Sequence, residues 1–463
     1  MHNRPNPNSP SSASPASYRR HARSILVLGM PLIGSHLAQM AIQLTDSIML
    51  GWFSVEALAA QVLAGTFFFV FFIMGSGFAF AVMPMVATAV AAGDETQVRR
   101  ITRMGCWASM IFAALVLPFM LRSEALFLVL DQKPQTAALA ADYLGIAGWV
   151  IVPALLVMVL KSYLAALERT QVVLWLTVAG VVLNAGVNYV LIFGNFGFPE
   201  MGVRGAAIAS LSVTSATLAA LCVYVALATP EHAMFQRIWR PDWEALRDVV
   251  RLGWPIGVTN LLETGLFAAS SVMMGWLGTV ALAAHGIALQ LTSLAFMVHV
   301  GLSNAATVRA GQFYGRRDRV ALRRVALVAG GLSGILALIA AAAFVLVPEL
   351  LMGGFLSPTE PDRAAVMAVG AGLLAAAAVF QLADAGQVMA LGLLRGVRDT
   401  RVPMIIAGIS YWVIGIPASY ILGFPLGLGG VGIWIGLAIG LTVASTLLAV
   451  RFWRWTGRWK VDG

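Results

Sequence analysis

The chain has 463 residues, of which 59% are hydrophobic and only 11% are charged. Because a soluble protein carries about 25% charged residues, this composition excludes a soluble globular domain and indicates a polytopic membrane protein. The net charge of +9 would suggest a nucleic-acid partner in a soluble protein, but in a membrane protein the placement of the basic residues matters more, and we expect no nucleic-acid partner.

The pattern along the chain predicts an all-α protein with twelve transmembrane helices. Residues 1–24 are assigned to a disordered cytoplasmic tail, because Met1–Ser17 is rich in Pro, Ser and Asn. Apolar runs of spanning length follow, separated by charged or Gly/Pro-rich breaks. The predicted helices lie near 25–50, 57–90, 101–121, 137–160, 172–194, 203–228, 250–275, 281–308, 320–346, 364–394, 402–422 and 429–450.

These helices divide into two lobes of six. Residues 25–228 form the predicted N-lobe and 250–450 the predicted C-lobe. Between them, 229–249 is read as a cytoplasmic linker, in which Trp239 and Trp243 suggest an amphipathic surface helix. Residues 451–463 form a basic cytoplasmic C-terminus.

The basic residues support this helix count independently. Apart from Arg122, Lys133, Arg204 and Arg363, every Lys and Arg falls in the tail, in the breaks after the even-numbered helices, or in the C-terminus. Since basic loops stay in the cytoplasm, both termini are predicted to be cytoplasmic. The lipid bilayer is therefore one partner, and we expect the protein in the bacterial inner membrane.

An internal repeat links the two lobes. Residues Leu252–Ala288 align with Leu28–Ala64 without a gap, and pairs such as Pro31 and Pro255 are identical. A match at half the chain length indicates a duplicated unit. Six helices per half, both halves starting on the same side, predict parallel repeats with a binding cavity between them.

Two buried acids are predicted to lie at similar depth in the C-lobe. Glu263 falls about 14 residues into the seventh helix, and Asp384 about ten residues before the end of the tenth, so both lie roughly 15–20 Å from the cytoplasmic side. Intramembrane acids usually mark ion pathways, although a purely structural polar clamp is the alternative. Two close carboxylates share a proton or bind a cation, which makes Na⁺ possible here. Their predicted polar neighbours are Thr259, Asn260, Gln381 and Gln387.

The N-lobe has its own candidate site. Asp46 lies in the outer third of the first helix, and Asn184 and Asn188 share one face of the fifth helix because they are four residues apart. These three residues predict a hydrated polar site, with interhelical hydrogen bonding as the alternative. Gln39 is the repeat equivalent of Glu263, and we include it among the supporting cavity residues.

Two further intramembrane residues are weaker candidates. His285 is included in the polar cavity as a residue that could relay protons, although a lone His in a helix bundle is more often a hydrogen-bond partner. Asp142 lies near the outer start of the fourth helix, where an interfacial carboxylate suits the positive helix terminus.

The sequence contains no phosphate-binding loop, no HExxH motif and no nucleophile elbow in a suitable context. We therefore expect no enzyme, no cofactor and no resident metal. A membrane-embedded enzyme would need clustered catalytic residues at a membrane face, which the sequence does not offer.

Three segments resemble the multidrug and toxic compound extrusion (MATE) transporters of the NorM-like bacterial branch. They are LGMPLIGSHLAQMAIQLTDSIMLG with Asp46, VVLNAGVNYVLIFGNFGFPEMGVRGAAIA with Asn184 and Asn188, and LADAGQVMALGLLRGVRDT with Asp384. The resemblance implies a two-lobed antiporter that expels cationic amphipathic compounds in exchange for Na⁺ or H⁺. It also implies that Asp46, Glu263 and Asp384 bind the coupling cation.

One position departs from the family pattern. This chain has Phe380 one turn before the acid of the tenth helix. In the family that it resembles, some Na⁺-coupled members have a Tyr at this position. One oxygen ligand is thus lost, which leaves both H⁺ and Na⁺ open as the coupling ion. The expected function is multidrug efflux by a monomer. The alternative transporter is a lipid-linked precursor flippase, which would need a basic central cavity.

Overall fold

The computed structural model describes residues 15–130, 132–356 and 361–459. Twelve spans in this described part are long and apolar enough to cross a membrane, which confirms the predicted all-α polytopic fold. The short helices α4 (Ser123–Val129) and α12 (Pro348–Gly353) lie between spans. The spans are α1 (Pro15–Phe53), α2 (Val55–Ala91), α3 (Glu95–Leu121), α5 with α6 (Pro134–Ala147 and Ile151–Ala166), α7 (Thr170–Phe193), α8 (Gly202–Ala228), α9 (Trp243–Trp276), α10 (Thr279–Gly315), α11 (Arg319–Leu346), α13 (Arg363–Gly396), α14 with α15 (Arg401–Gly408 and Ile416–Gly423) and α16 (Gly429–Arg458).

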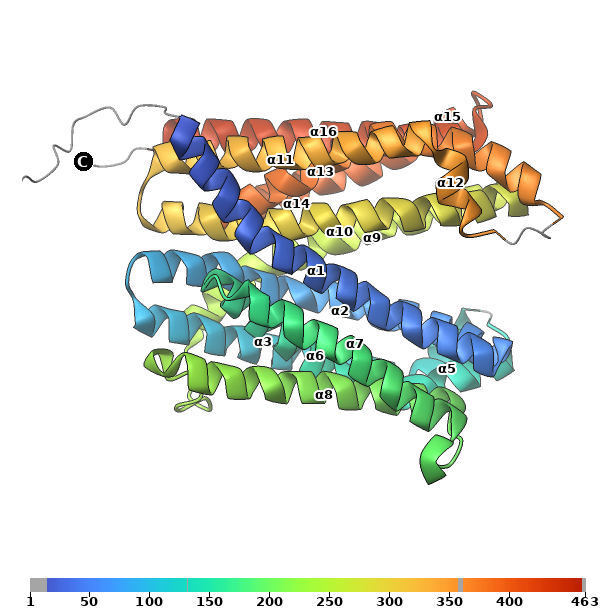
Figure 1. Cartoon of the computed structure of the whole chain (residues 1–463), viewed down its shortest axis with the longest axis horizontal. Helices are drawn as coiled ribbons and strands as arrows, with labels where there is room; N and C mark the ends of the chain where they lie inside the picture. Colours follow the sequence, from blue (N-terminus) through green and yellow to red (C-terminus); the bar gives the residue numbers. More distant parts are fainter. Residues whose placement is uncertain (1–14, 131, 357–360, 460–463) are drawn as a thin grey trace, which may run out of the picture.

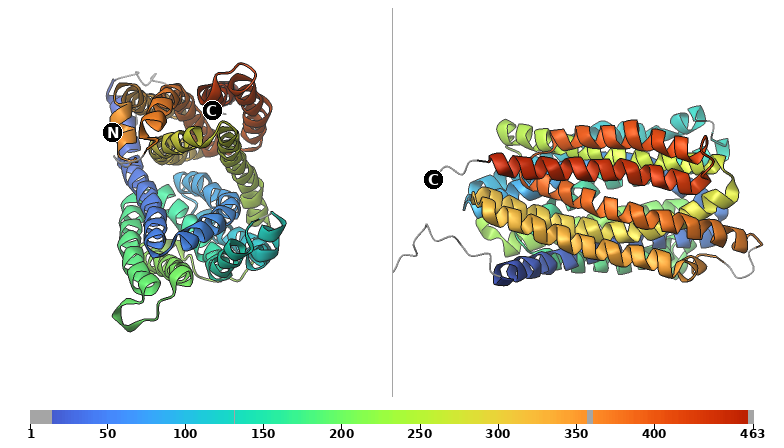
Figure 2. Two further views of the ribbon diagram at one scale, coloured as in Figure 1. Left: turned by 90° about the vertical axis from the view of Figure 1, so that its right-hand side faces the viewer. Right: turned by 90° about the horizontal axis from the view of Figure 1, so that it is seen from above.

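The helices form two lobes. The first helix of each lobe begins in contact with the other lobe. In Figure 1, α2 to α8 lie below and α10 to α16 above, while α1 crosses from the upper lobe to the lower. Ile25 and Leu28 of α1 pack in the hydrophobic core of the C-lobe. Val249 and Ile256 of α9 pack in the core of the N-lobe. Figure 2 shows α1 along one side of both lobes, so α1 connects them.

The internal repeat extends to the helix boundaries. Shifting the N-lobe by 224 positions places the start of α2 at Thr279, its end at Gly315 and the start of α3 at Arg319. These are the residues at which α10 begins and ends and α11 begins. The second and third spans of the two lobes therefore have the same lengths to within one residue, as expected for a duplicated unit.

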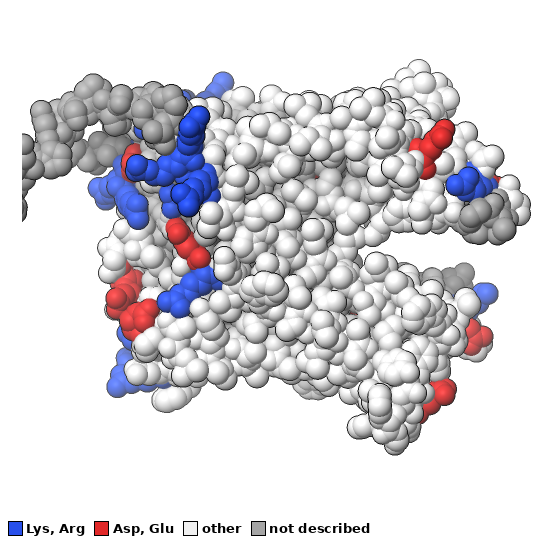
Figure 3. Space-filling model, viewed as in Figure 1, with Lys and Arg blue, Asp and Glu red and all other residues white. Residues whose placement is uncertain are grey.

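The lobes meet at one end of the molecule and separate at the other. Figure 3 shows the basic residues gathered at one end and a deep cleft between the lobes at the opposite end. At the closed end, α2 and α9 cross so tightly that a Cβ on Gly77 would lie 2.4 Å from the Gly253 carbonyl oxygen. A Cβ on Gly301 of α10 would lie 2.5 Å from Ile33 of α1. Since real Cβ atoms do not approach so closely, these glycines permit the closure.

Two expectations about the chain ends and the linker need correction. Residues 15–24, which we assigned to the disordered tail, form the first turns of α1, and His21 packs edge-on against Phe313 of α10 with ring centroids 5.7 Å apart. This tertiary contact orders the segment; residues 1–14 lie outside the described part.

The surface helix suggested around Trp239 and Trp243 is not present in residues 229–242. That segment has only the short 3-10 helix Pro230–His232 and turns, and Trp243 begins α9. Contacts with α3 hold it instead: Arg103 donates to the Gln236 carbonyl oxygen at 2.6 Å. The Arg100 guanidinium beside Asp242 holds the pKa of that carboxyl below its usual range.

Candidate functional site

Polar side chains join α9 to α13 at the two predicted C-lobe acids. The two helices run antiparallel here, because Asn260 accepts a hydrogen bond from Arg395 at 2.9 Å while Glu263 accepts one from Gln387 at 3.1 Å. One turn further, Phe267 packs edge-on against Phe380 with centroids 5.8 Å apart. Glu263 is half-buried. Asn260 and Gln387 thus lie in one polar cluster with Glu263 and Arg395.

Asp384 is less exposed to solvent than Glu263 and has fewer hydrogen-bond partners. Its side chain is only 1% exposed, and its Oδ1 atom has no hydrogen-bond partner. The carboxylates of Asp384 and Glu263 lie close enough for their charges to interact. Both polar atoms of Gln381 and the Oε1 atom of Gln387 are also buried without partners. Because buried polar groups are nearly always bonded, this group of atoms has the character of a ligand site.

A third element, which the sequence reading missed, contributes to this cluster. Residues Ile409–Gly415 form a π-helical segment between α14 and α15. Pro417, the second residue of α15, has no N–H to donate, which accounts for the widened turn. The segment places Tyr411 near Glu263 and Asp384, fully buried, with a hydroxyl group that has no partner. The Tyr411 hydroxyl therefore supplies this site with an oxygen atom that the side chain of Phe380 lacks.

Arg395 brings a positive charge to the same site. We expected it in a cytoplasmic break, but it lies within α13 and is half-buried. It bonds with Asn260, interacts with the charge of Glu263, and lies 5.9 Å from the ring centroid of Phe80 on α2. Since Phe80 belongs to the N-lobe, Arg395 links the carboxylates to the contact between the lobes.

In the N-lobe, Asp46 and the two asparagines of α7 form a hydrogen-bonded cluster. Asn188 donates to Asp46 at 2.5 Å and to Asn184 at 3.2 Å. Ser210 of α8 donates to the other oxygen of Asp46 at 3.4 Å. Asp46 is 7% exposed, so the carboxylate is buried among neutral donors. This is a smaller polar cluster than that of the C-lobe, with one acid instead of two.

The remaining predicted residues lie outside both clusters. Gln39 is exposed on α1, two turns from Asp46 toward the closed end. His285 is buried, and both ring nitrogens have partners: Trp434 donates to Nδ1 at 3.1 Å, and Ser271 lies 3.2 Å from Nε2. Asp142 forms a surface ion pair with Arg204 at 2.6 Å.

Lys161 is a second half-buried basic residue, which the sequence predicted to lie in a loop. It lies within α6, five residues before the end of that helix. Its charge acts on His36 of α1, which in turn lies 3.1 Å from Asn304 of α10. A polar contact therefore joins α1 to α10 between the lobes. A single Lys inside the apolar run VMVLKSYLAAL was the signal that could have located it.

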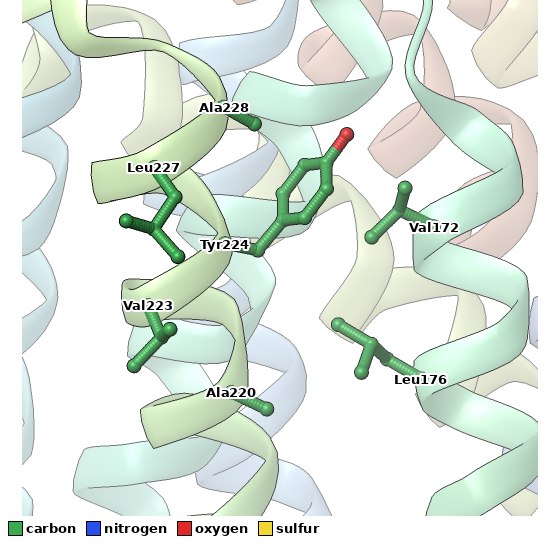
Figure 4. A pocket seen from close by; sticks show the side chains of 7 residues that line it. All are labelled: Val172, Leu176, Ala220, Val223, Tyr224, Leu227 and Ala228. Carbon is green, nitrogen blue, oxygen red and sulfur yellow. The ribbon is translucent and has the colours of Figure 1, made fainter.

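Two surface recesses lie away from these carboxylates. One, of about 570 Å³, lies between α7 and α8 and has an apolar lining with the single hydroxyl of Tyr224 (Figure 4). Leu176, the lining residue of α7 nearest to Asn184, is more than two turns from it. The other, of about 600 Å³, lies among α1, α11 and α16 and contains arginines.

The sequence matches the MatE family over residues 31–190 and 255–421. The chain belongs to the MatE family. It is 47% identical to the "Probable multidrug resistance protein NorM" of Rhizobium meliloti (strain 1021) over 440 residues, which cover 95% of this chain and 94% of that protein. It is 36% identical to the "Multidrug resistance protein NorM" of Burkholderia vietnamiensis, covering 95% of this chain and 96% of that protein.

Solved structures of other transporters have the same fold. One, described as the outward-facing conformation of a multidrug resistance MATE family transporter of the MOP superfamily, aligns with a TM-score of 0.85 at 20% identity, over 97% of this chain and 99% of that one. A MOP superfamily transporter from Pyrococcus furiosus aligns with a TM-score of 0.85 at 21% identity, over 94% and 96%. The chain is therefore a NorM-like membrane transporter and not an enzyme.

Proposed function

We propose that this NorM-like chain exports cationic amphipathic compounds of several kinds by secondary antiport, in exchange for H⁺ or Na⁺. The names of its relatives in Rhizobium meliloti and Burkholderia vietnamiensis support multidrug efflux. The observation that carries the antiport is the C-lobe cluster, in which Glu263 and Asp384 interact across α9 and α13 beside unpartnered polar atoms.

The chemistry of this pair supplies the coupling. Two nearby carboxylates in a low-dielectric bundle cannot both be ionised cheaply, so the pair holds a proton or a Na⁺ when no drug is present. Gln381, Gln387 and Tyr411 offer oxygen atoms to either ion. A drug cation in the cleft neutralises the same negative charge. Drug and ion therefore compete, directly or through the lobe conformation, and this competition drives the exchange.

The conformation supports alternating access between the two lobes. If the basic end is cytoplasmic, as basic residues in membrane proteins generally are, then the cleft of Figure 3 opens to the outside. Both termini then lie in the cytoplasm of a bacterial cell, and the site is in the inner membrane. The inward-open state would require the glycine contacts of α2 with α9 to separate.

The proposal is tested by transport of a fluorescent organic cation in proteoliposomes, with Na⁺ and pH gradients imposed separately. One of the two gradients is expected to drive the cation against its own gradient, by up to about tenfold per pH unit for a one-to-one exchange. Glu263→Gln should abolish the transport that the ion gradient drives. Asp142→Asn, which alters a surface carboxylate, should leave this transport unchanged.

Two results would contradict the proposal. The first is cation movement in the wild type that neither gradient alters. The second is transport of a lipid-linked anion but of no organic cation, which would favour the flippase alternative.

A further inference from the structure

A recess at the basic end lies where three helices from different parts of the chain meet. It has a volume of about 600 Å³ and lies at the start of α11, between the first turns of α1 and the last turns of α16. Its lining combines three arginines, two aromatic residues and two aliphatic residues. They are Tyr18, Arg319, Val320, Arg323, Arg324, Leu327 and Trp453.

The arginines of this recess are arranged for an anionic group. Arg319 and Arg323 are four residues apart on α11, so they share one face. Arg323 lies 5.0 Å from the ring centroid of Trp453, which orients its guanidinium. Within the described residues, no carboxylate forms an ion pair with Arg319 or Arg323. A phosphate group accepts two parallel hydrogen bonds from such a guanidinium.

The internal repeat shows what an anionic partner does at this position. The shift of 224 residues places Arg324 over Arg100 of the N-lobe. There the linker supplies two carboxylates, because Arg100 donates to Asp242 at 3.1 Å and to Glu244 at 3.0 Å. The N-lobe copy of this helix face therefore binds anionic groups through its guanidinium.

The apolar part of the recess identifies this anion as the head of an amphiphile. Val320 and Leu327 are each 53% exposed, and the exposed apolar surface of α11 continues through Ile335 and Leu338. Tyr and Trp side chains are typical of the membrane–water interface, where the head groups of lipids lie. A ligand with a phosphate at Arg319 and Arg323 would lay its acyl chains along Leu327.

We propose that an anionic phospholipid binds in this recess and stabilises the conformation in which the basic end is closed. The recess joins Tyr18 of α1 to two helices of the C-lobe, and α1 continues into the N-lobe, where it carries Asp46. A lipid bound across this junction holds the start of α1 against the C-lobe. The lipid therefore binds more tightly to the conformation in which α1 contacts α11 and α16. Its binding shifts the conformational equilibrium toward that conformation.

The test measures the thermal stability of the full chain in detergent with added lipid. Phosphatidylglycerol is titrated against phosphatidylcholine with the same acyl chains, and inorganic phosphate forms a third arm. We expect phosphatidylglycerol alone to raise the melting temperature. In the double variant Arg319→Ala/Arg323→Ala, the lipid concentration that gives half of the effect should rise about thirtyfold.

The matched control is Arg247→Ala/Arg251→Ala, which removes two exposed basic residues with the same spacing from α9 at the same end. It should respond to lipid as the wild type does. Arg323→Gln, which keeps a long side chain over Trp453, gives the same test if the double variant does not fold. An unchanged lipid response in Arg323→Gln and the double variant, or equal stabilisation by inorganic phosphate, would overturn the lipid site.

Discussion

At the scale of single residues, hydrogen-bond partners distinguish the acids that we propose to bind the coupling ion from the surface carboxylate of Asp142. Asp142 bonds with the charged Arg204 at the surface. Asp46 and Glu263 instead accept hydrogen bonds from neutral amide groups inside the bundle. A neutral partner stabilises a carboxylate less than a guanidinium does, so these acids can exchange a proton or a cation during transport.

Asp46 is predicted to be secondary in coupling, because the N-lobe cluster has one acid and the C-lobe cluster two. Asp46→Asn should slow efflux about fivefold, yet leave ion-dependent release of substrate through Glu263 and Asp384. The measurement is ion-driven release from proteoliposomes. If Asp46→Asn abolishes this release while Glu263→Gln spares it, the roles of the two lobes are reversed.

Tyr411 is predicted to act on the coupling ion without supporting the fold. Its hydroxyl is buried without a partner beside both C-lobe carboxylates. Tyr411→Phe should weaken the apparent affinity for the coupling ion about tenfold, and should change the free energy of unfolding by less than about 0.5 kcal/mol. Tyr420→Phe alters an exposed Tyr of the same span and serves as the control. Equal ion dependence in both variants would remove Tyr411 from the site.

The sequence located the acids because a charged residue inside an apolar run is conspicuous. It also predicted the contact of Asp46 with Asn188, since the two asparagines share a helix face. It could not locate Tyr411 or Arg395, because Tyr is common in membrane helices and Arg395 lies at a helix end that resembles a basic loop. Only the contacts that α9 makes with the π-helical segment and with Arg395 show their position.

At the scale of elements, the glycine contacts of α2 with α9 hold the lobes together at the closed end. Gly77→Ala would place a Cβ 2.4 Å from the backbone of α9. The helices must then move apart, and the free energy of unfolding should fall by about 1–3 kcal/mol. Spin labels at Ala92 and Arg316, one exposed residue of each lobe at the basic end, should report a longer distance.

Gly186→Ala is the matched control for this substitution, since a Cβ at Gly186 on α7 would meet nothing within 4 Å. It should leave both the stability and the label distance as in the wild type. A Gly77→Ala variant that behaves in the same way would show that this crossing does not hold the closed end.

Helix count and repeat were predictable because spanning length and a gapless duplication are strong signals in an apolar sequence. The structure of the linker was not predictable. Trp239 and Trp243 suggested a surface helix, but contacts with α3 hold the segment in turns. The π-helical segment before Pro417 and the exchange of α1 and α9 between lobes were also beyond the sequence. Each depends on contacts between residues that are far apart in the chain.

At the scale of the whole molecule, the distribution of charge predicts the orientation in the membrane. Single cysteines placed at Glu200 and Pro361, in a chain without Cys106 and Cys222, should react with an impermeant maleimide from outside intact cells. Cysteines at Glu244 and Arg317 should react only after the membrane is opened. Labelling of Arg317→Cys from outside would contradict the orientation, because the basic end could then not be cytoplasmic.

The central claim is that drug and coupling ion compete at Glu263 and Asp384. The most direct test is drug affinity by fluorescence anisotropy in detergent, for the wild type and Glu263→Gln, from about pH 6 to about pH 8 with and without Na⁺. In the wild type, H⁺ or Na⁺ should weaken drug binding. In Glu263→Gln, residual binding should lose most of this dependence. Equal pH and Na⁺ dependence in both proteins would contradict the account and would make Asp46 the next candidate.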